Sequence, residues 1–283
     1  MNTKYFTLLI LLGVILSIFL FVTAPPPLLS DDNTSKKISV EKILKILNNE
    51  NKIVRSIYTK EIVIKGKKSG LKFDEKWQED GIIAGPLPAQ FLRETAKNLE
   101  RRPVRLGLYL GSDYPINEAN KLTGTQLNKF KDIKENNKDQ FFQVIDLGIY
   151  VYMSADIAIA KACVNCHNKH TQSPKKNWVL NDVMGATTWT YPEEKISIED
   201  AIIMISEFQL SVKKSYERYI KHITSKKNPP LIGKQWPIEG YFLPSTKEFM
   251  KKITTKSSSM ILSSLIKISN HSDASRTSNV KGL

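Results

Sequence analysis

The stretch FFQVIDLGIYVYMSA, residues 141–155, predicts the sheet around which this chain folds. It is rich in aromatic and β-branched residues, which strands favour, and the turn-forming residues 146–148 interrupt it. We therefore expect a β-hairpin or two adjacent strands here. Upstream, residues 104–110 (VRLGLYL) alternate between apolar and other residues. Downstream, residues 185–190 form a further strand-like run.

Helical spacing of apolar residues surrounds these strands. It begins at Ser39, a plausible N-cap, and recurs at 85–101, where Pro88 suits the first turn of a helix. We predict an α+β domain over residues 38–195, with a small antiparallel sheet flanked by helices. A helical extension at 196–268 and a disordered tail at 269–283 are expected to follow.

The N-terminal residues 5–23 carry no charge and are long enough, at about 1.5 Å per residue, to cross a hydrocarbon core of about 30 Å. Lys4 precedes them and no charge follows until Asp31, which predicts a cytoplasmic N-terminus with the remainder outside. A cleaved signal peptide is the alternative, since Val22 and Ala24 form a weak cleavage site. We predict an uncleaved anchor at 1–24 in the cytoplasmic (inner) membrane, a linker at 25–37, and a periplasmic or extracytoplasmic domain.

The formal net charge of +14 raises the question of nucleic-acid binding. The excess is mostly lysine, it is spread along the whole chain, and no aromatic and basic recognition motif accompanies it. Such a distribution is typical of a solvated surface, so we predict that nucleic acid is not a partner.

The chemistry of the chain concentrates in KACVNCHNKH, residues 161–170, which contain its only two cysteines. The C-x-x-C-H spacing is that of c-type haem attachment, in which two thiols add to the vinyl groups of the porphyrin and the next histidine binds the iron. Cys163, Cys166 and His167 would fill these three roles. The predicted cofactor is therefore a covalently attached haem c, with His167 as the metal ligand.

Two other interpretations of the motif are weaker. A structural zinc site needs four ligands, and Cys163, Cys166 and His170 supply only three. A redox dithiol normally lies in a thioredoxin-like βαβ unit, which the predicted elements do not provide.

Several blocks around the motif resemble one known family. These are IAGPLPAQFLRETAKNLE, RLGLYL, YPINEAN, KACVNCHN and SPKKNWVLNDVMGATTW, in this order over about residues 40–192. They are similar to the exported single-haem c-type cytochrome domains of the Tll type, formerly a domain of unknown function, which occur alone or ahead of histidine kinases. The resemblance implies a PAS-like fold that carries one haem and a sensing role, with thioethers at Cys163 and Cys166 and His167 as the proximal ligand.

The chain departs from that family at the sixth iron ligand. The best-described member uses a second cysteine from its N-terminal helical region, whereas residues 39–60 contain none here. Met153, Met184 and His222 are the candidates, and an open coordination position is the alternative. Aromatic residues that are candidates to line the haem pocket are Trp77, Trp178, Trp189, Tyr109 and Tyr150.

The sequence therefore predicts a non-enzymatic haem protein that senses redox state or a bound gas and acts on a signalling or electron-transfer partner. An electron-carrying cytochrome is the first alternative. A peroxidase-like enzyme is the second, although no distal histidine or arginine is assigned to it.

Overall fold

The computed structural model describes residues 12–14 and 37–280, and the chain divides into two units, Met1–Lys36 and Lys37–Leu283. The predicted anchor at 1–24 lies outside the described residues apart from 12–14, which form a helical turn. Among the described helices, none is long and apolar enough to cross a membrane, because the longest ones carry charged residues along their length. The predicted fold class, a PAS-like sheet with a transmembrane helix, is therefore wrong as stated. The described chain is α+β with small sheets.

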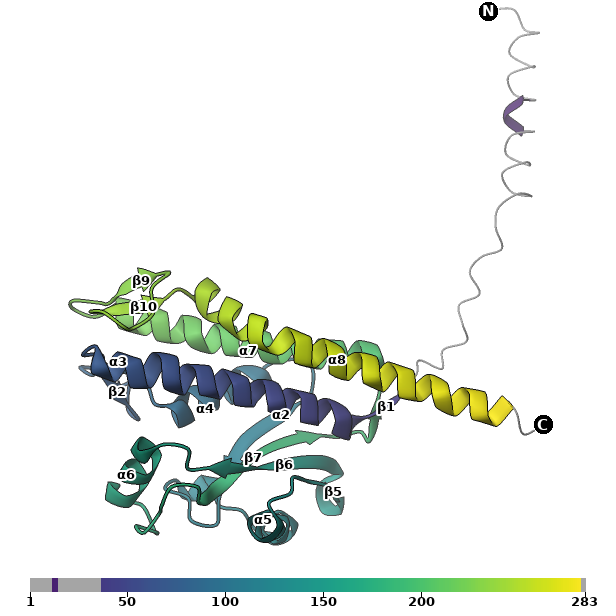
Figure 1. Ribbon diagram of the computed structural model, residues 1–283, viewed down its shortest axis with the longest axis horizontal. Coiled ribbons are helices and arrows are strands. Elements are labelled where there is room, and N and C mark those ends of the chain that lie inside the picture. The colour runs from purple at the N-terminus through teal and green to yellow at the C-terminus, as the bar shows by residue number, and fades with distance from the viewer. Residues whose placement is uncertain (1–11, 15–36, 281–283) are drawn as a thin grey trace, which may run out of the picture. The chain divides into compact units, whose positions relative to one another are not determined.

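The second unit contains helices and short strands throughout (Figure 1). The α-helices are α2 (Val40–Ile57), α3 (Lys65–Lys68), α4 (Pro88–Glu100), α5 (Gly124–Asn136), α6 (Lys161–Lys169), α7 (Ile198–Thr224) and α8 (Thr246–Val280). A π-helix, η1 (Tyr58–Ile64), joins α2 to α3, and η2 (Glu118–Asn120) and η3 (Ile145–Leu147) are 3-10 turns. The strands are β1 (Ile38–Ser39), β2 (Phe73–Asp74), β3 (Gly85–Pro86), β4 (Gly107–Gly111), β5 (Gln140–Val144), β6 (Ile149–Ile157), β7 (Val183–Tyr191), β8 (Lys195–Ile196), β9 (Leu231–Gly233) and β10 (Phe242–Pro244).

The main sheet has four antiparallel strands in the order β4-β7-β6-β5. The predicted hairpin at 141–155 is β5 and β6, joined by η3 and by Gly148, whose φ of 61° lies in the left-handed region that glycine adopts without strain. The pairing of β6 with β7 is irregular at Asp156 and Ile157, immediately before the chain leaves the sheet towards α6. Three two-stranded ladders complete the described strands: β1 with β8, β2 with β3, and β9 with β10.

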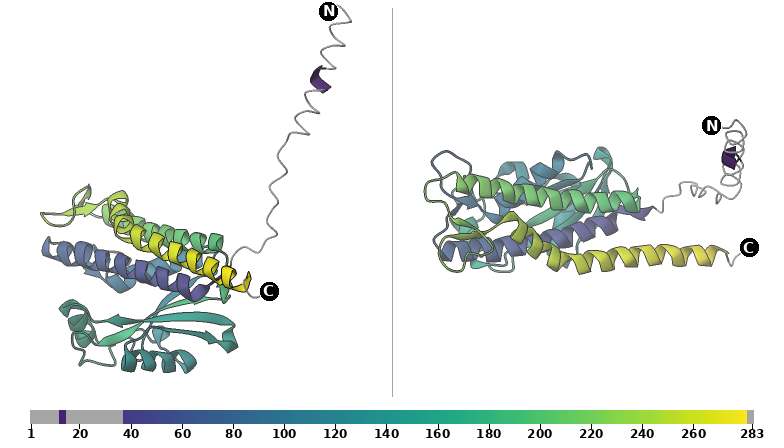
Figure 2. Two further views of the ribbon diagram at one scale, coloured as in Figure 1. Left: turned by 45° about the vertical axis from the view of Figure 1, so that its right-hand side comes forward. Right: turned by 90° about the horizontal axis from the view of Figure 1, so that it is seen from above.

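Each face of the main sheet packs against helices (Figures 1 and 2). Neighbouring residues of β6 point to opposite faces, as a strand requires. Tyr152 belongs to the large core shared with α2, α4, α7 and α8, whereas Met153 packs under α5 with Phe130 and Ile133. The sheet is thus covered by one helix on one side and by a bundle of helices on the other.

The two long C-terminal helices belong to this bundle. Phe249 of α8 stacks on Tyr216 of α7 with ring centroids 4.1 Å apart, and Tyr58 stacks on Phe91 of α4 at 4.0 Å. The rings of Tyr58 and Phe249 meet edge to face at 6.4 Å, which joins the two stacked pairs. The predicted extension therefore shares one hydrophobic core with the predicted domain.

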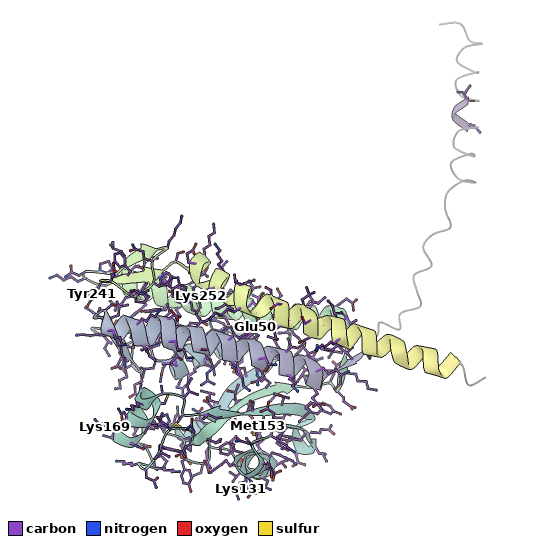
Figure 3. The ribbon with its side chains drawn as sticks, viewed as in Figure 1. Glu50, Lys131, Met153, Lys169, Tyr241 and Lys252 are labelled. Carbon is purple, nitrogen blue, oxygen red and sulfur yellow. The ribbon has the colours of Figure 1, made fainter. Side chains whose placement is uncertain are left out.

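A buried carboxyl group links α2 to both C-terminal helices (Figure 3). Glu50 accepts hydrogen bonds from Gln209 of α7 at 2.7 Å and from Ser257 of α8 at 3.3 Å, and its second oxygen has no partner among the described residues. Burial raises the pKa of Glu50 above its ordinary value, and the two hydrogen bonds partly oppose this. The folded protein therefore binds a proton at Glu50 more tightly than the unfolded chain does.

This proton linkage predicts how Glu50→Gln changes the pH dependence of stability. The contribution of Glu50 is fully present below the unfolded pKa of 4.5 and is lost as the pH rises through the raised folded value. As the pH rises from the unfolded to the folded pKa of Glu50, the free energy of unfolding of the variant should increase relative to that of the wild type. The increase should be about 1.4 kcal/mol for each unit by which folding raises the pKa. Urea unfolding of both proteins between acid and neutral pH measures the difference, and parallel pH profiles would contradict the prediction.

Candidate functional site

The helix α6 carries the cysteine motif at one end of the main sheet (Figure 1). It begins after Ala160, which offers no side-chain cap, and it ends at Lys169, beyond which His170 is extended. The structure describes all nine of its residues and buries none of them. A short helix with so little packing of its own leaves its functional side chains available to a further group.

The two cysteines are free thiols one turn apart on α6. Cys163 is partly buried against Ala158, Trp178 and Met184, and Cys166 is exposed. Burial raises the pKa of both thiols, and the nearby Glu75 carboxylate raises that of Cys166 further. Both thiols are therefore largely protonated at neutral pH.

His167 lies half-buried beside Cys166. Its ring meets Trp178 edge to face at 6.5 Å and 86°, and its Nδ1 atom is buried without a hydrogen-bond partner among the described residues. Loss of solvation lowers the pKa of His167, and the carboxylate of Asp156 opposes this effect. The imidazole is thus held neutral, which is the form that binds a metal ion.

The loop after α6 is fastened back onto the helix by Asn168. Its Nδ2 donates to the carbonyl oxygen of Trp178 at 2.9 Å, and its Oδ1 accepts from the Trp178 amide at 2.8 Å. The ammonium group of Lys175 lies 4.0 Å from the centre of the Trp178 ring. These contacts fix the indole that packs against His167 and Cys163.

The segment between β2 and β3 contacts the other end of the motif. Glu75 lies 3.2 Å from Nε2 of His170, and the Lys67 ammonium lowers the pKa of Cys166 through its charge. A cavity of about 690 Å³ is lined by Lys67 of α3, by residues 70–74 up to the end of β2, and by residues 81–84 just before β3. Its volume is within the usual range for ligand pockets, but its lining residues do not include the motif.

The three candidates for a sixth ligand lie in different places. Met153 is fully buried under α5, away from α6, as Figure 3 shows by the labels of Met153 and Lys169. Met184 packs with Cys163 and Trp178, on the side of α6 where His167 also lies. His222 is on α7, with its ring against Trp77 at 5.1 Å.

The five aromatic candidates, which core packing explained equally well, lie in different parts of the fold. Trp178 alone of the five packs directly on the motif. Trp189 is in the helical core, Tyr109 packs with the α5 cluster, Tyr150 stacks on Phe141, and Trp77 contacts α7.

Three residues of the site are absent from the sequence prediction. Arg55 of α2 forms an ion pair with Asp156, 101 residues later, and Asp156 lies close enough to influence Cys163 and His167. Glu75 approaches from a segment about 90 residues before the motif, which matches no pattern. Of the three, only Asp156 has a feature in the sequence that could have marked it: it is a charged residue at the end of a buried strand, shortly before the motif.

The pKa shifts predict slow alkylation of both thiols in protein without an attached group. The thiolate is the reactive form, and a raised pKa reduces its fraction at a given pH. Iodoacetamide at pH 7.5 should therefore label Cys163 and Cys166 several times more slowly than it labels a synthetic peptide of residues 161–169. Mass spectrometry over time measures both rates, and equal or faster labelling of the folded protein would show that the thiols are activated.

Within residues 12–14 and 37–268, no group of three or more His, Cys, Asp or Glu side chains is placed to hold a metal ion. Catalytic dithiols need a lowered thiol pKa, whereas both values are raised here.

Fold and site together define a class: α+β proteins that carry two free cysteines and a half-buried histidine on one short helix beside an antiparallel sheet. A family model described as Tll0287-like matches residues 32–192, more than half of the chain, and the chain belongs to this Tll0287-like family. The predicted resemblance is thus confirmed at the level of the family. Searches of the curated proteins and of the solved structures found no match.

Proposed function

We propose that this chain holds one covalently attached haem c through Cys163 and Cys166, with His167 as an iron ligand, and that it senses redox state or a small bound ligand. The observation that carries the proposal is the arrangement of α6. Two free thiols lie one turn apart, the adjacent imidazole is held neutral, and the helix has little packing of its own.

The side chains fit this cofactor in their chemistry. Thioether formation needs two unpaired thiols at this spacing, and iron binding needs an unprotonated ring nitrogen. His167 supplies the neutral ring, and its buried Nδ1 has no hydrogen-bond partner among the residues that the structure describes. The membership in the Tll0287-like family supports the same assignment.

Each residue around the motif has a distinct task in this proposal. Cys163 and Cys166 anchor the cofactor, and His167 holds a nitrogen towards the iron. Trp178, fixed by Asn168, orients the imidazole and shields it from water. When bound, haem supplies a reversible one-electron couple and a site for small ligands.

The positions of the sixth-ligand candidates favour sensing over simple electron transfer. Met153 is buried under α5, and Met184 shares the side of α6 on which His167 lies. Residues 75–77 contact His170 through Glu75 and α7 through Trp77, so they lie between His222 and the motif. An open coordination position, which these placements support, suits the binding of a small ligand.

Electron transfer is the second candidate, and the exposure of Cys166 favours it. A cofactor anchored there would have an edge near solvent, within reach of a protein partner.

Two measurements on the full chain, expressed with a c-type haem attachment system, test the proposal. Haem that stays with the polypeptide after acid-acetone extraction and denaturing electrophoresis supports covalent attachment, and complete extraction overturns it. Tight binding of carbon monoxide to the reduced protein supports sensing. Absence of carbon monoxide binding, with fast reversible reduction, supports the electron carrier instead.

A further inference from the structure

An ion pair joins the last turn of α2 to the strand that leads into the motif. Arg55 Nη2 lies 2.8 Å from Oδ1 and 2.9 Å from Oδ2 of Asp156, and Arg55 Nη1 donates to Thr187 at 3.1 Å. The side chains of Arg55 and Asp156 are 24% and 27% exposed, so solvent screens their charges only in part.

The carboxylate of this pair is the acidic group that influences both Cys163 and His167. Asp156 tends to raise the pKa values of Cys163 and His167, and Arg55 opposes it at Cys163. Asp156 lies at the irregular end of β6, only a few residues before α6 begins. The pair therefore joins α2 to the end of the strand that leads into the motif.

The helix α2 extends from this pair into the bundle. Five residues before Arg55, Glu50 accepts hydrogen bonds from Gln209 of α7 and Ser257 of α8. Arg55 and Glu50 both belong to one continuous helix, Val40–Ile57. A shift of Arg55 would therefore act on the element that holds α7 and α8 together.

We propose that the Asp156–Arg55 pair sets the reduction potential of the haem held by His167 and transmits the charge on the iron to α2. This inference rests on the proposed function and adds its regulation. The electron is exchanged with an external one-electron donor or acceptor, so oxidation leaves one additional positive charge on the iron. That charge attracts the Asp156 carboxylate and weakens its contact with Arg55.

The two members of the pair have opposite electrostatic effects on the iron. Asp156 stabilises the ferric state, so Asp156→Asn should raise the midpoint potential. Arg55→Gln removes the cation that offsets Asp156 and should lower it. A local structural disturbance would not produce shifts of opposite sign from two residues in direct contact.

Potentiometric titration of the full haem-loaded chain with redox mediators tests the first part. We expect each variant to change the ferric-to-ferrous equilibrium about tenfold at fixed ambient potential, which is about 59 mV for a one-electron couple. Asp146→Asn and Arg105→Gln are matched controls, because Asp146 lies in η3 and Arg105 pairs with Glu193, both at the opposite end of the sheet from α6. They should leave the midpoint unchanged.

Hydrogen exchange of α2 tests the transmission. Amides of residues 54–57 should exchange severalfold faster in ferric than in ferrous wild-type protein, and this difference should disappear in Asp156→Asn. Midpoints equal to those of the controls, shifts of the same sign, or exchange independent of oxidation state would overturn the inference. Each of these outcomes would be measured on protein that still carries covalent haem. If the proposed function itself failed, the wild-type protein would carry no covalent haem.

Discussion

Replacing both Cys163 and Cys166 with serine is expected to abolish covalently held haem. The chain has no other cysteine, so no thiol remains to form a thioether. After acid-acetone extraction and denaturing electrophoresis, haem-dependent peroxidase staining of the polypeptide should fall from full intensity to background. This is the largest effect that the proposed site predicts, because the change removes every attachment bond.

Two further variants make this result specific. Cys163→Ser alone should retain haem through one thioether, with a shifted pyridine haemochrome spectrum that reports the unreacted vinyl group. Asn165→Ala changes an exposed residue between the two cysteines and should retain the normal spectrum. Covalent haem in the double serine variant would show that attachment occurs through another residue and would refute the assigned roles.

Truncation of Phe249 to alanine is expected to cost about 3–5 kcal/mol of stability, as is usual for a buried phenylalanine. The ring is fully buried on α8, stacks on Tyr216, and meets Tyr58 and Phe91 edge to face. The loss should appear in urea unfolding of the full chain as a lower midpoint for the α+β core and the C-terminal helices together. The reason is that the ring packs against both parts.

The matched control is Leu262→Ala on the same helix. Leu262 is 60% exposed, so its truncation should change stability by no more than about 0.5 kcal/mol. If Phe249→Ala altered unfolding of the C-terminal helices while the remainder kept its wild-type midpoint, the shared core would be refuted.

The parts of the fold that depend on local pattern were predictable. Aromatic and β-branched residues with Gly148 between them gave the β5–β6 hairpin, and Ser39 marks the start of α2. The spacing of Cys163, Cys166 and His167 identified the candidate site, and the structure places all three on one helix. The predicted transmembrane element is not among the described helices.

The parts that depend on distant contacts were not predictable. The pairing of Arg55 with Asp156 joins residues 101 positions apart, and no periodic pattern records it. Met153 and Met184 were equivalent as sequence candidates, yet Met153 lies in the middle of β6 under α5, whereas Met184 lies at the irregular end of the β6–β7 pairing, in the cluster with Trp178. The helical pattern of α7 and α8 indicated their type, but only the packing of Phe249 shows that they complete the core.

The shared hydrophobic core extends beyond the residues that the family model matches. The Tll0287-like match ends at residue 192, whereas the aromatic cluster of Tyr58 and Phe91 is closed by side chains from α7 and α8. A chain that stopped at the end of the match would leave this apolar surface of α2, η1 and α4 in water. Such a chain would have to find a substitute cover, from a following domain of different origin or from a second subunit. The segment that the family model matches and the segment that shares one hydrophobic core are therefore different lengths of the same polypeptide.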